Sequence, residues 1–147
     1  TQQVSSAASD VYKRQLKETQ KACHICCGYP NSLDSEHYKK ADLDAYDKIA
    51  DLVEDSSIDE VSLEDSHRPL DLKLLEKFKK TKVIMGLIDV AKSRMESVEE
   101  IQKRIREVLE HIDEERLIAA PDCGLGFFDR NQAKQKMQIL SKAVKNL

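Results

Sequence analysis

The sequence contains no tryptophan, and aromatic residues make up only 5% of its 147 residues. Aromatic side chains normally supply much of the area that a core buries, so this core must be aliphatic, built from Leu, Ile, Val and Ala. Apolar residues still account for 40% of the chain, which is enough for a core. The length suits one domain.

The chain also lacks an excess of basic charge and a long apolar run. Its net charge of -3 gives it no electrostatic reason to bind nucleic acid or an anionic membrane. No stretch reaches the ~18 consecutive apolar residues of a transmembrane helix. The N-terminus has no basic segment followed by an apolar one, as a secretory signal has. We therefore expect no nucleic-acid or membrane partner, and a cytoplasmic location.

Residues 1–15 are polar and show no clear periodicity. Part of this stretch, residues 9–15, resembles a translated adapter scar from assembled sequencing reads. The alternative is an ordinary disordered tail. We therefore treat residues 1–15 as a tail or artefact, and residues 16–147 as the folded region.

Apolar periodicity divides the rest of the chain into alternating strands and helices. The clearest strand is 82–90, whose near-continuous apolar run is typical of a parallel strand buried on both faces. The clearest helix begins at the capping box formed by residues 97–100 and runs to about His111. The other expected strands are 22–27, 58–63 and 117–120, and the other expected helices are 42–53, 70–78 and 131–144.

Four strand–helix units in a row predict an α/β fold with a parallel sheet. Four units are half of an eight-unit barrel, so the expected fold is the C-terminal half of a TIM (β/α)8 barrel. A half barrel has two exposed sheet edges. Either a missing N-terminal half of the barrel or a second copy of the chain is therefore expected to cover them. A stand-alone domain is the remaining alternative.

Three of the four cysteines, Cys23, Cys26 and Cys27, lie close together beside His24. In a reducing compartment such a set indicates metal ligands or reactive thiols rather than disulfides. In an extended segment His24 and Cys26 point the same way, so an imidazole and a thiolate can reach one ion. Zinc prefers such nitrogen and sulfur ligands.

Glu64 and Cys123 each follow one of the other predicted strands. Because active sites form where the strand ends of a parallel sheet meet, we expect both residues to lie near His24 and Cys26. Taken singly, each has a more ordinary interpretation. A free cysteine often packs as a small apolar residue, and an acid after a strand usually lies at the surface. Taken together, the four residues favour a metal site.

Four segments resemble, in order, the C-terminal catalytic domain of cobalamin-independent methionine synthase: H-I-C at 24–26, V-S-L-E-D-S at 61–66, L-I-D-V at 87–90 and A-P-D-C-G-L at 120–125. The resemblance implies a zinc-dependent methyltransferase. In that family, zinc binds the homocysteine thiol as a thiolate, which attacks the methyl group of 5-methyltetrahydrofolate (polyglutamate) and gives methionine. The implied zinc ligands are His24, Cys26, Glu64 and Cys123.

The resemblance also places Asp89 in the active-site face, as a candidate catalytic residue that orients a substrate amine or a ligand. The methionine synthases carry a histidine, thought to handle protons near the folate, where this sequence has Ala91. A polar loop at 29–41 also lengthens the spacing between Cys26 and Glu64, and could shape the donor pocket.

Because of these differences from the family, two alternatives to the folate-dependent methyltransferase remain open. Related zinc thiol alkyltransferases use other donors, namely epoxides or methyl-corrinoid proteins, so the alkyl donor can differ. The chain can also be a non-catalytic fragment or an interaction domain whose cysteines are packed.

Other polar residues are weaker candidates. Cys23 and Cys27 are expected to pack, since they point away from the ligands. His67 is expected in a surface loop, with a position just behind the metal as the alternative. Asp122 is expected to hydrogen-bond the loop around Cys123. Solvated positions are expected for His37 and His111, and candidate anion contacts are Arg68 and Arg94.

Overall fold

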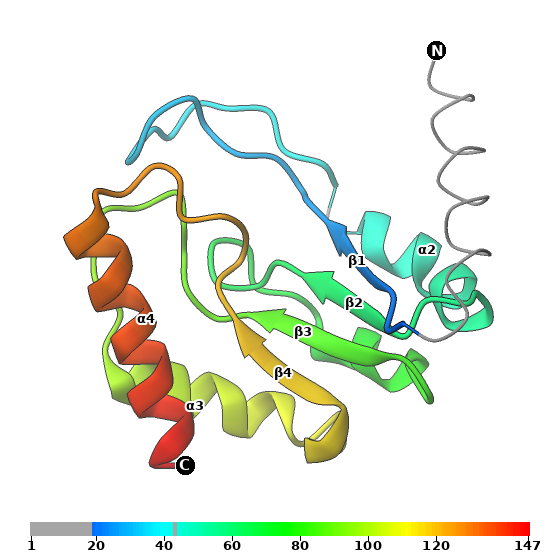
Figure 1. Cartoon of the computed structure of the whole chain (residues 1–147). Helices are drawn as coiled ribbons and strands as arrows, with labels where there is room; N and C mark the ends of the chain where they lie inside the picture. Colours follow the sequence, from blue (N-terminus) through cyan, green and yellow to red (C-terminus); the bar gives the residue numbers. More distant parts are fainter. Residues whose placement is uncertain (1–18, 43) are drawn as a thin grey trace.

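Four parallel strands alternate with helices in the computed structural model, which describes residues 19–42 and 44–147 (Figure 1). The expected tail at 1–15 lies outside these residues. The strands are β1 (Ala22–Ile25), β2 (Glu60–Leu63), β3 (Lys82–Gly86) and β4 (Leu117–Ala120). The helices are α2 (Asp44–Asp55), α3 (Val98–Val108) and α4 (Arg130–Lys145), with two 3-10 helices, η1 (Leu72–Lys77) and η2 (Glu114–Arg116).

The sheet has the strand order β1-β2-β3-β4, and each neighbouring pair is parallel. Each strand lies beside the next one in the sequence, which confirms the expected parallel α/β arrangement. The order does not reverse, as it would in a doubly wound sheet. The loops that follow the strands lie toward one end of the sheet (Figure 1). Within the described residues, no helix is long and apolar enough to cross a membrane.

The two faces of the sheet differ in what covers them. On one face, side chains such as Val61, Leu63, Val83 and Met85 are at most 1% exposed and belong to the core. This core is mostly aliphatic, as expected, but it also contains the buried aromatic side chains of Tyr46 and Phe78. Cys23 packs against this core, as expected. The opposite face carries an aligned row with more exposure, consisting of His24, Ser62, Ile84 and Ile118. Alternation along β1 therefore keeps the imidazole of His24 out of the core.

The apolar run at 82–90 is only partly a strand, because β3 ends at Gly86. Beyond it, Asp89 donates its backbone N–H to the Glu96 carboxylate at 3.0 Å rather than to a neighbouring strand. The segment 87–91 is nevertheless buried. Its apolar character therefore reflects burial of an irregular segment, which periodicity alone does not distinguish from a strand.

The expected helices form with adjusted bounds. The capping box is confirmed, since the Ser97 hydroxyl accepts the Glu100 N–H and the Glu100 carboxylate accepts the Ser97 N–H. Helix α4 begins at Arg130, one residue before the expected start, because Asp129 caps it. The segment at 70–78 forms the shorter 3-10 helix η1 instead of an α-helix.

Gly86 lies where the loop after β4 comes closest to the end of β3. A Cβ atom on Gly86 would lie 2.1 Å from Asp122 Oδ1 and 2.7 Å from Asp122 Cα. Both distances are too short for any non-bonded contact. The close approach of Asp122 to β3 therefore requires glycine at this position.

We expect Gly86→Ala to lower the free energy of unfolding by about 2–3 kcal/mol, the cost of overpacking a site whose backbone must move. Gly126→Ala is the matched control, because a Cβ atom there meets nothing within 4 Å. Urea denaturation followed by circular dichroism measures both variants. Equal transition midpoints would contradict the close packing of Asp122 on β3.

Candidate metal centre

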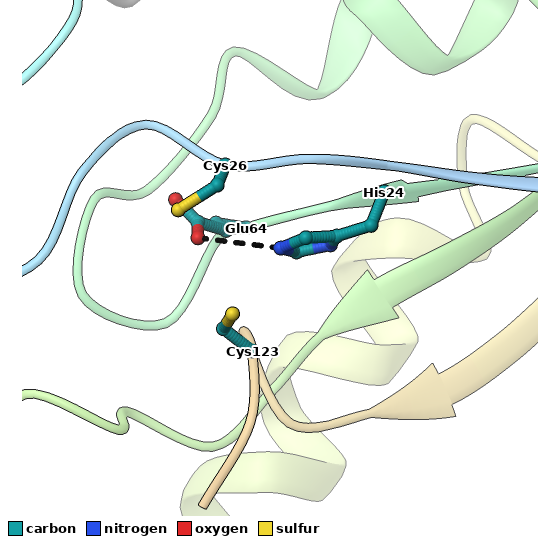
Figure 2. A group of neighbouring side chains, drawn as sticks. All are labelled: His24, Cys26, Glu64 and Cys123. Atoms are coloured by element: carbon teal, nitrogen blue, oxygen red, sulfur yellow. Dashed lines mark ion pairs between the residues drawn. The ribbon is translucent and has the colours of Figure 1, made fainter. Parts of the chain in front are cut away.

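Three strand ends bring the four expected ligands together (Figure 2). His24 lies in β1 and Cys26 just beyond it, Glu64 follows β2, and Cys123 lies in the loop after β4. One potential ligand atom from each residue lies within 4.8 Å of each of the others. The topology thus converts residues far apart in the sequence into one cluster.

The donor set and its spacing suit zinc. Zinc binds nitrogen, sulfur and carboxylate ligands in a tetrahedron with bonds of about 2.0–2.3 Å, which sets its ligand atoms roughly 3.3–3.8 Å apart. The ligand atoms of this cluster, within 4.8 Å of one another, need only small side-chain movements to reach that geometry. The residues present therefore fit a zinc ion.

The imidazole of His24 is held by its neighbour in the sheet. His24 and Ser62 are partners in the β1–β2 register, and His24 Nδ1 lies 2.9 Å from Ser62 Oγ. Nε2 lies 3.9 Å from Glu64 Oε1. When Nδ1 donates its proton to Ser62, Nε2 carries the lone pair. Metal-ligating histidines are usually oriented by such a hydrogen bond on the second nitrogen.

The carboxylate of Glu64 is buried, and the residue is only 1% exposed. Its Oε2 accepts the Cys27 backbone N–H at 2.7 Å, whereas Oε1 has no hydrogen-bond partner among the residues that the structure describes. Burying a carboxylate is costly unless a donor or a cation compensates its charge. The ordinary interpretation of Glu64 as a surface acid is therefore wrong, and its free oxygen indicates a place for a cation.

The thiol of Cys26 is poorly suited to ionise by itself. Burial, followed by the Glu64 carboxylate, raises the pKa of Cys26 to about 12, although a backbone hydrogen bond with Gly28 acts in the opposite direction. At neutral pH the thiol therefore keeps its proton. A metal ion that binds here must displace that proton, because the thiolate is the ligand form.

His67 does not lie in a surface loop, because its side chain is only 2% exposed. Its Nδ1 lies 2.8 Å from Asp122 Oδ2, and its Nε2 lies 3.9 Å from Glu64 Oε2. The geometry therefore agrees with the alternative position just behind the cluster. Tyr29, which the sequence singled out only as part of the polar loop at 29–41, packs against His67 with ring centroids 5.1 Å apart and ring planes tilted by 38°. Its place in the same loop as Cys26 is the signal that could have found it.

The sequence suggested that the Asp122 side chain hydrogen-bonds the loop around Cys123, but its partners lie elsewhere. Its buried carboxylate instead accepts backbone N–H groups from the loop after β2, beginning with Asp65 at 3.0 Å. The expectation was wrong because Asp122 faces across β3 rather than along its own loop, a direction that local sequence does not reveal.

Asp89, the candidate catalytic residue, is not among the clustered ligands. It is 7% exposed, and its Oδ1 accepts the Ala91 N–H at 2.7 Å. Its catalytic role stays a prediction. Ala91 is also buried, and its carbonyl accepts the Asp34 N–H at 2.9 Å. The polar loop at 29–41 therefore docks beside the position where the resemblance places a histidine.

The remaining candidates lie at the surface or have protein partners. Cys27 is buried and His37 is exposed, as expected. His111 is only partly exposed, because its Nδ1 lies 2.8 Å from a carboxylate oxygen of Glu76. The two arginines contact protein oxygens: Arg68 the carbonyl of Ala41, and Arg94 the carboxylate of Glu100.

Residues 14–146 match the family model described as the catalytic domain of cobalamin-independent synthase. The chain is 40% identical over 100 residues to methionine synthase of Thermococcus kodakarensis, and 36% identical over 100 residues to that of Pyrococcus horikoshii. Each match covers 67% of this chain and 30% of the relative. The chain thus spans less than a third of the length of these relatives.

The fold agrees with solved structures. A B12-independent methionine synthase from Shewanella sp. W3-18-1, in complex with selenomethionine, matches 90% of this chain and 40% of its own, with a TM-score of 0.72 and 26% identity. A putative vitamin-B12 independent methionine synthase from Listeria monocytogenes matches with a TM-score of 0.57 at 18% identity, which bears on the fold alone. Because the family model covers most of its length, the chain belongs to the cobalamin-independent synthase family and forms part of the catalytic domain.

Proposed function

We propose that this chain supplies the zinc-binding part of a methyltransferase. The enzyme would move a methyl group from 5-methyltetrahydrofolate (polyglutamate) to the homocysteine thiol, giving methionine. The observation that carries the proposal is the cluster of an imidazole, two thiols and a buried carboxylate at three strand ends, with ligand atoms within 4.8 Å of one another. The names of the relatives, methionine synthase, support the same activity.

Two of the four proposed ligands, His24 and Glu64, are oriented by neighbours in the fold. Ser62 bonds the second nitrogen of His24, and the Cys27 N–H holds Oε2 of Glu64, which leaves Oε1 without a hydrogen-bond partner in the described part of the chain. A bound zinc ion would act as a Lewis acid that lowers the pKa of a substrate thiol. Two thiolates and a carboxylate make the site anionic, which keeps a substrate sulfur nucleophilic. The ligand atoms would be His24 Nε2, Cys26 Sγ, Glu64 Oε1 and Cys123 Sγ.

We also assign Asp89 a role in catalysis, as the residue that orients the substrate amine. The Ala91 N–H fixes one oxygen of the Asp89 carboxylate, so the orientation of the group is set before any substrate arrives. A carboxylate is the natural partner of a protonated amine.

The share of its relatives that this chain covers fits part of a barrel. We propose that residues 16–147 form the C-terminal part of a (β/α)8 barrel in a cytoplasmic enzyme. A missing N-terminal half, or a second copy, would pair with β1 and β4 and contribute the contacts to the methyl donor. The matches to 30% of the relatives and to 40% of the Shewanella chain support this arrangement.

A different alkyl donor is the second candidate, and one observation favours it. Ala91 has no titratable side chain, and the loop at 29–41 is bonded to its carbonyl through Asp34. A donor that needs no proton transfer at this position, such as a methyl-corrinoid protein, would suit that arrangement.

The proposal is tested by metal analysis and by thiol binding. We expect one zinc ion per chain, and we expect homocysteine to strengthen the sulfur-to-metal charge-transfer absorption of the cobalt(II)-substituted protein. Methionine formation with the folate donor, compared with methylcobalamin, then separates the two candidate donors.

The competing interpretation is a structural zinc site in a non-catalytic domain. Structural sites are closed and hold the fold together, whereas catalytic sites keep a position for substrate. Unfolding of the chain by a chelator, together with a cobalt spectrum that homocysteine leaves unchanged, would therefore rule out the proposed function.

A further inference from the structure

The side chain of Asp122 is fully buried, and protein donors surround both of its carboxylate oxygens. Oδ1 accepts the backbone N–H groups of Asp65 at 3.0 Å and Ser66 at 2.9 Å. Oδ2 accepts the backbone N–H of His67 at 2.9 Å and lies 2.8 Å from His67 Nδ1. One carboxylate thus gathers three successive amides and a ring nitrogen. Charge-assisted bonds of this kind are stronger than neutral ones.

These bonds join two loops that the sheet does not connect directly. Strands β2 and β4 are separated by β3, so ladder hydrogen bonds link them only through that strand. Asp122 reaches across the end of β3 at Gly86, which has no side chain to block it. The backbone N–H of Asp122 also donates to the Ile88 carbonyl at 3.0 Å. This bond fixes the position of the Asp122 backbone, and so the point from which its side chain extends.

Each end of this link is next to an expected ligand. Asp65, the first amide donor, follows Glu64 in the chain, and Asp122 itself precedes Cys123. The ring of His67, held by Asp122, points its Nε2 toward Glu64 Oε2 at 3.9 Å. The position of the Glu64 carboxylate relative to the Cys123 thiol therefore depends on the bonds that Asp122 makes.

We propose that Asp122 is a positioning residue that holds the Glu64 and Cys123 loops in register, so that the metal-binding geometry exists before the ion arrives. The inference rests on the proposed zinc-binding function. Ligands that are already ordered lose little conformational freedom on binding, which strengthens affinity without any new contact to the ion.

Asp122→Asn is the direct test. Asparagine keeps the shape, but it places an NH2 group against two of the donors that the carboxylate accepts. We expect the zinc dissociation constant, measured by competition with a chromophoric chelator, to rise about 10- to 100-fold, the usual effect of losing a group that orients a ligand.

Asp129→Asn is the matched control. Asp129 also accepts two backbone N–H groups, those of Asn131 and Gln132, but at the start of α4. The control makes the same change in charge away from the cluster. Both N–H groups meet Oδ1, which asparagine also has, and asparagine caps a helix as well as aspartate does, so the control should change neither stability nor zinc affinity by much. Equal zinc affinities for the two variants would overturn the proposal, because the loss of a negative charge, and not the link to the loop after β2, would then explain any effect.

Amide hydrogen exchange on the unaltered chain gives a test that does not depend on a variant folding. The amides of Asp65, Ser66 and His67 lie outside helices and strands, yet they should exchange slowly because Asp122 accepts them. Exchange at the rate of an open loop would refute the link. If these amides are protected but the unaltered chain binds no zinc, the proposed function fails while the link between the loops stands.

Discussion

Replacing Cys123 with serine is expected to weaken zinc binding about 100- to 1,000-fold. Structural zinc sites with four ligands have binding free energies of about 10–16 kcal/mol, so one ligand accounts for roughly 2.5–4 kcal/mol. Serine preserves the shape of the side chain but offers no thiolate. Competition with a chromophoric chelator measures the affinity, and the charge-transfer absorption of the cobalt(II) form should fall to that of a single thiolate.

Cys23→Ser provides the matched control for this experiment. Cys23 lies in β1 beside His24, but its side chain packs against the core on the other face of the sheet. The same change of sulfur to oxygen should therefore leave zinc affinity unaltered. If Cys123→Ser retains one tightly held zinc ion per chain and full thiol-alkylation activity, the proposed ligand set is wrong.

The second large effect is expected on stability, when Lys136 in α4 is replaced. The side chain of this lysine is 0% exposed. Its Nζ lies 2.9 Å from Glu96 Oε2, and it donates to the carbonyls of Asp89 at 3.0 Å and Arg94 at 2.7 Å. Glu96 in turn accepts the Asp89 N–H. This buried pair therefore ties α4 to the irregular segment after β3, which carries the candidate catalytic residue.

We expect Lys136→Met to lower the free energy of unfolding by about 3–5 kcal/mol. Removing one partner of a buried ion pair leaves the other charge uncompensated, which is the costly case. Here the Glu96 carboxylate would remain buried with the Asp89 N–H as a donor. Urea denaturation measures the loss of stability.

Lys134→Met tests whether the effect comes from burial. Lys134 lies two residues earlier in the same helix and is exposed, so the same substitution should change stability little. Comparable losses in the two variants would show that the substitution acts on the helix generally, and not through the Lys136–Glu96 pair.

The parts of the fold that could be predicted are those that depend on local sequence. The capping box at Ser97 and the apolar periodicity of α3 needed only neighbouring residues, so both agree with the structure. The end of β3 was harder to place, because the buried segment 87–91 has the composition of a strand. Within it, the backbone N–H of Asp89 donates to the Glu96 side chain, and composition does not specify such a partner.

The site divides in the same way. Residues His24 and Cys26 share one segment, and Glu64 and Cys123 each follow a predicted strand, so topology was enough to expect them together. The buried position of His67 was not predictable, since a histidine between serine and arginine in a short loop has the sequence of a surface turn.

The sequence by itself determined the order of strands and helices, the mostly aliphatic character of the core and the residue types available for a metal. Tertiary structure alone decided how the ligands are oriented. The bonds from Asp122 to the loop after β2 span 55 to 57 positions in the chain, and the bond between His24 and Ser62 spans 38. Hydrogen bonds between residues so distant form only when the strands are in register, and those of Asp122 also require the glycine at position 86. No local pattern in the sequence can therefore predict them.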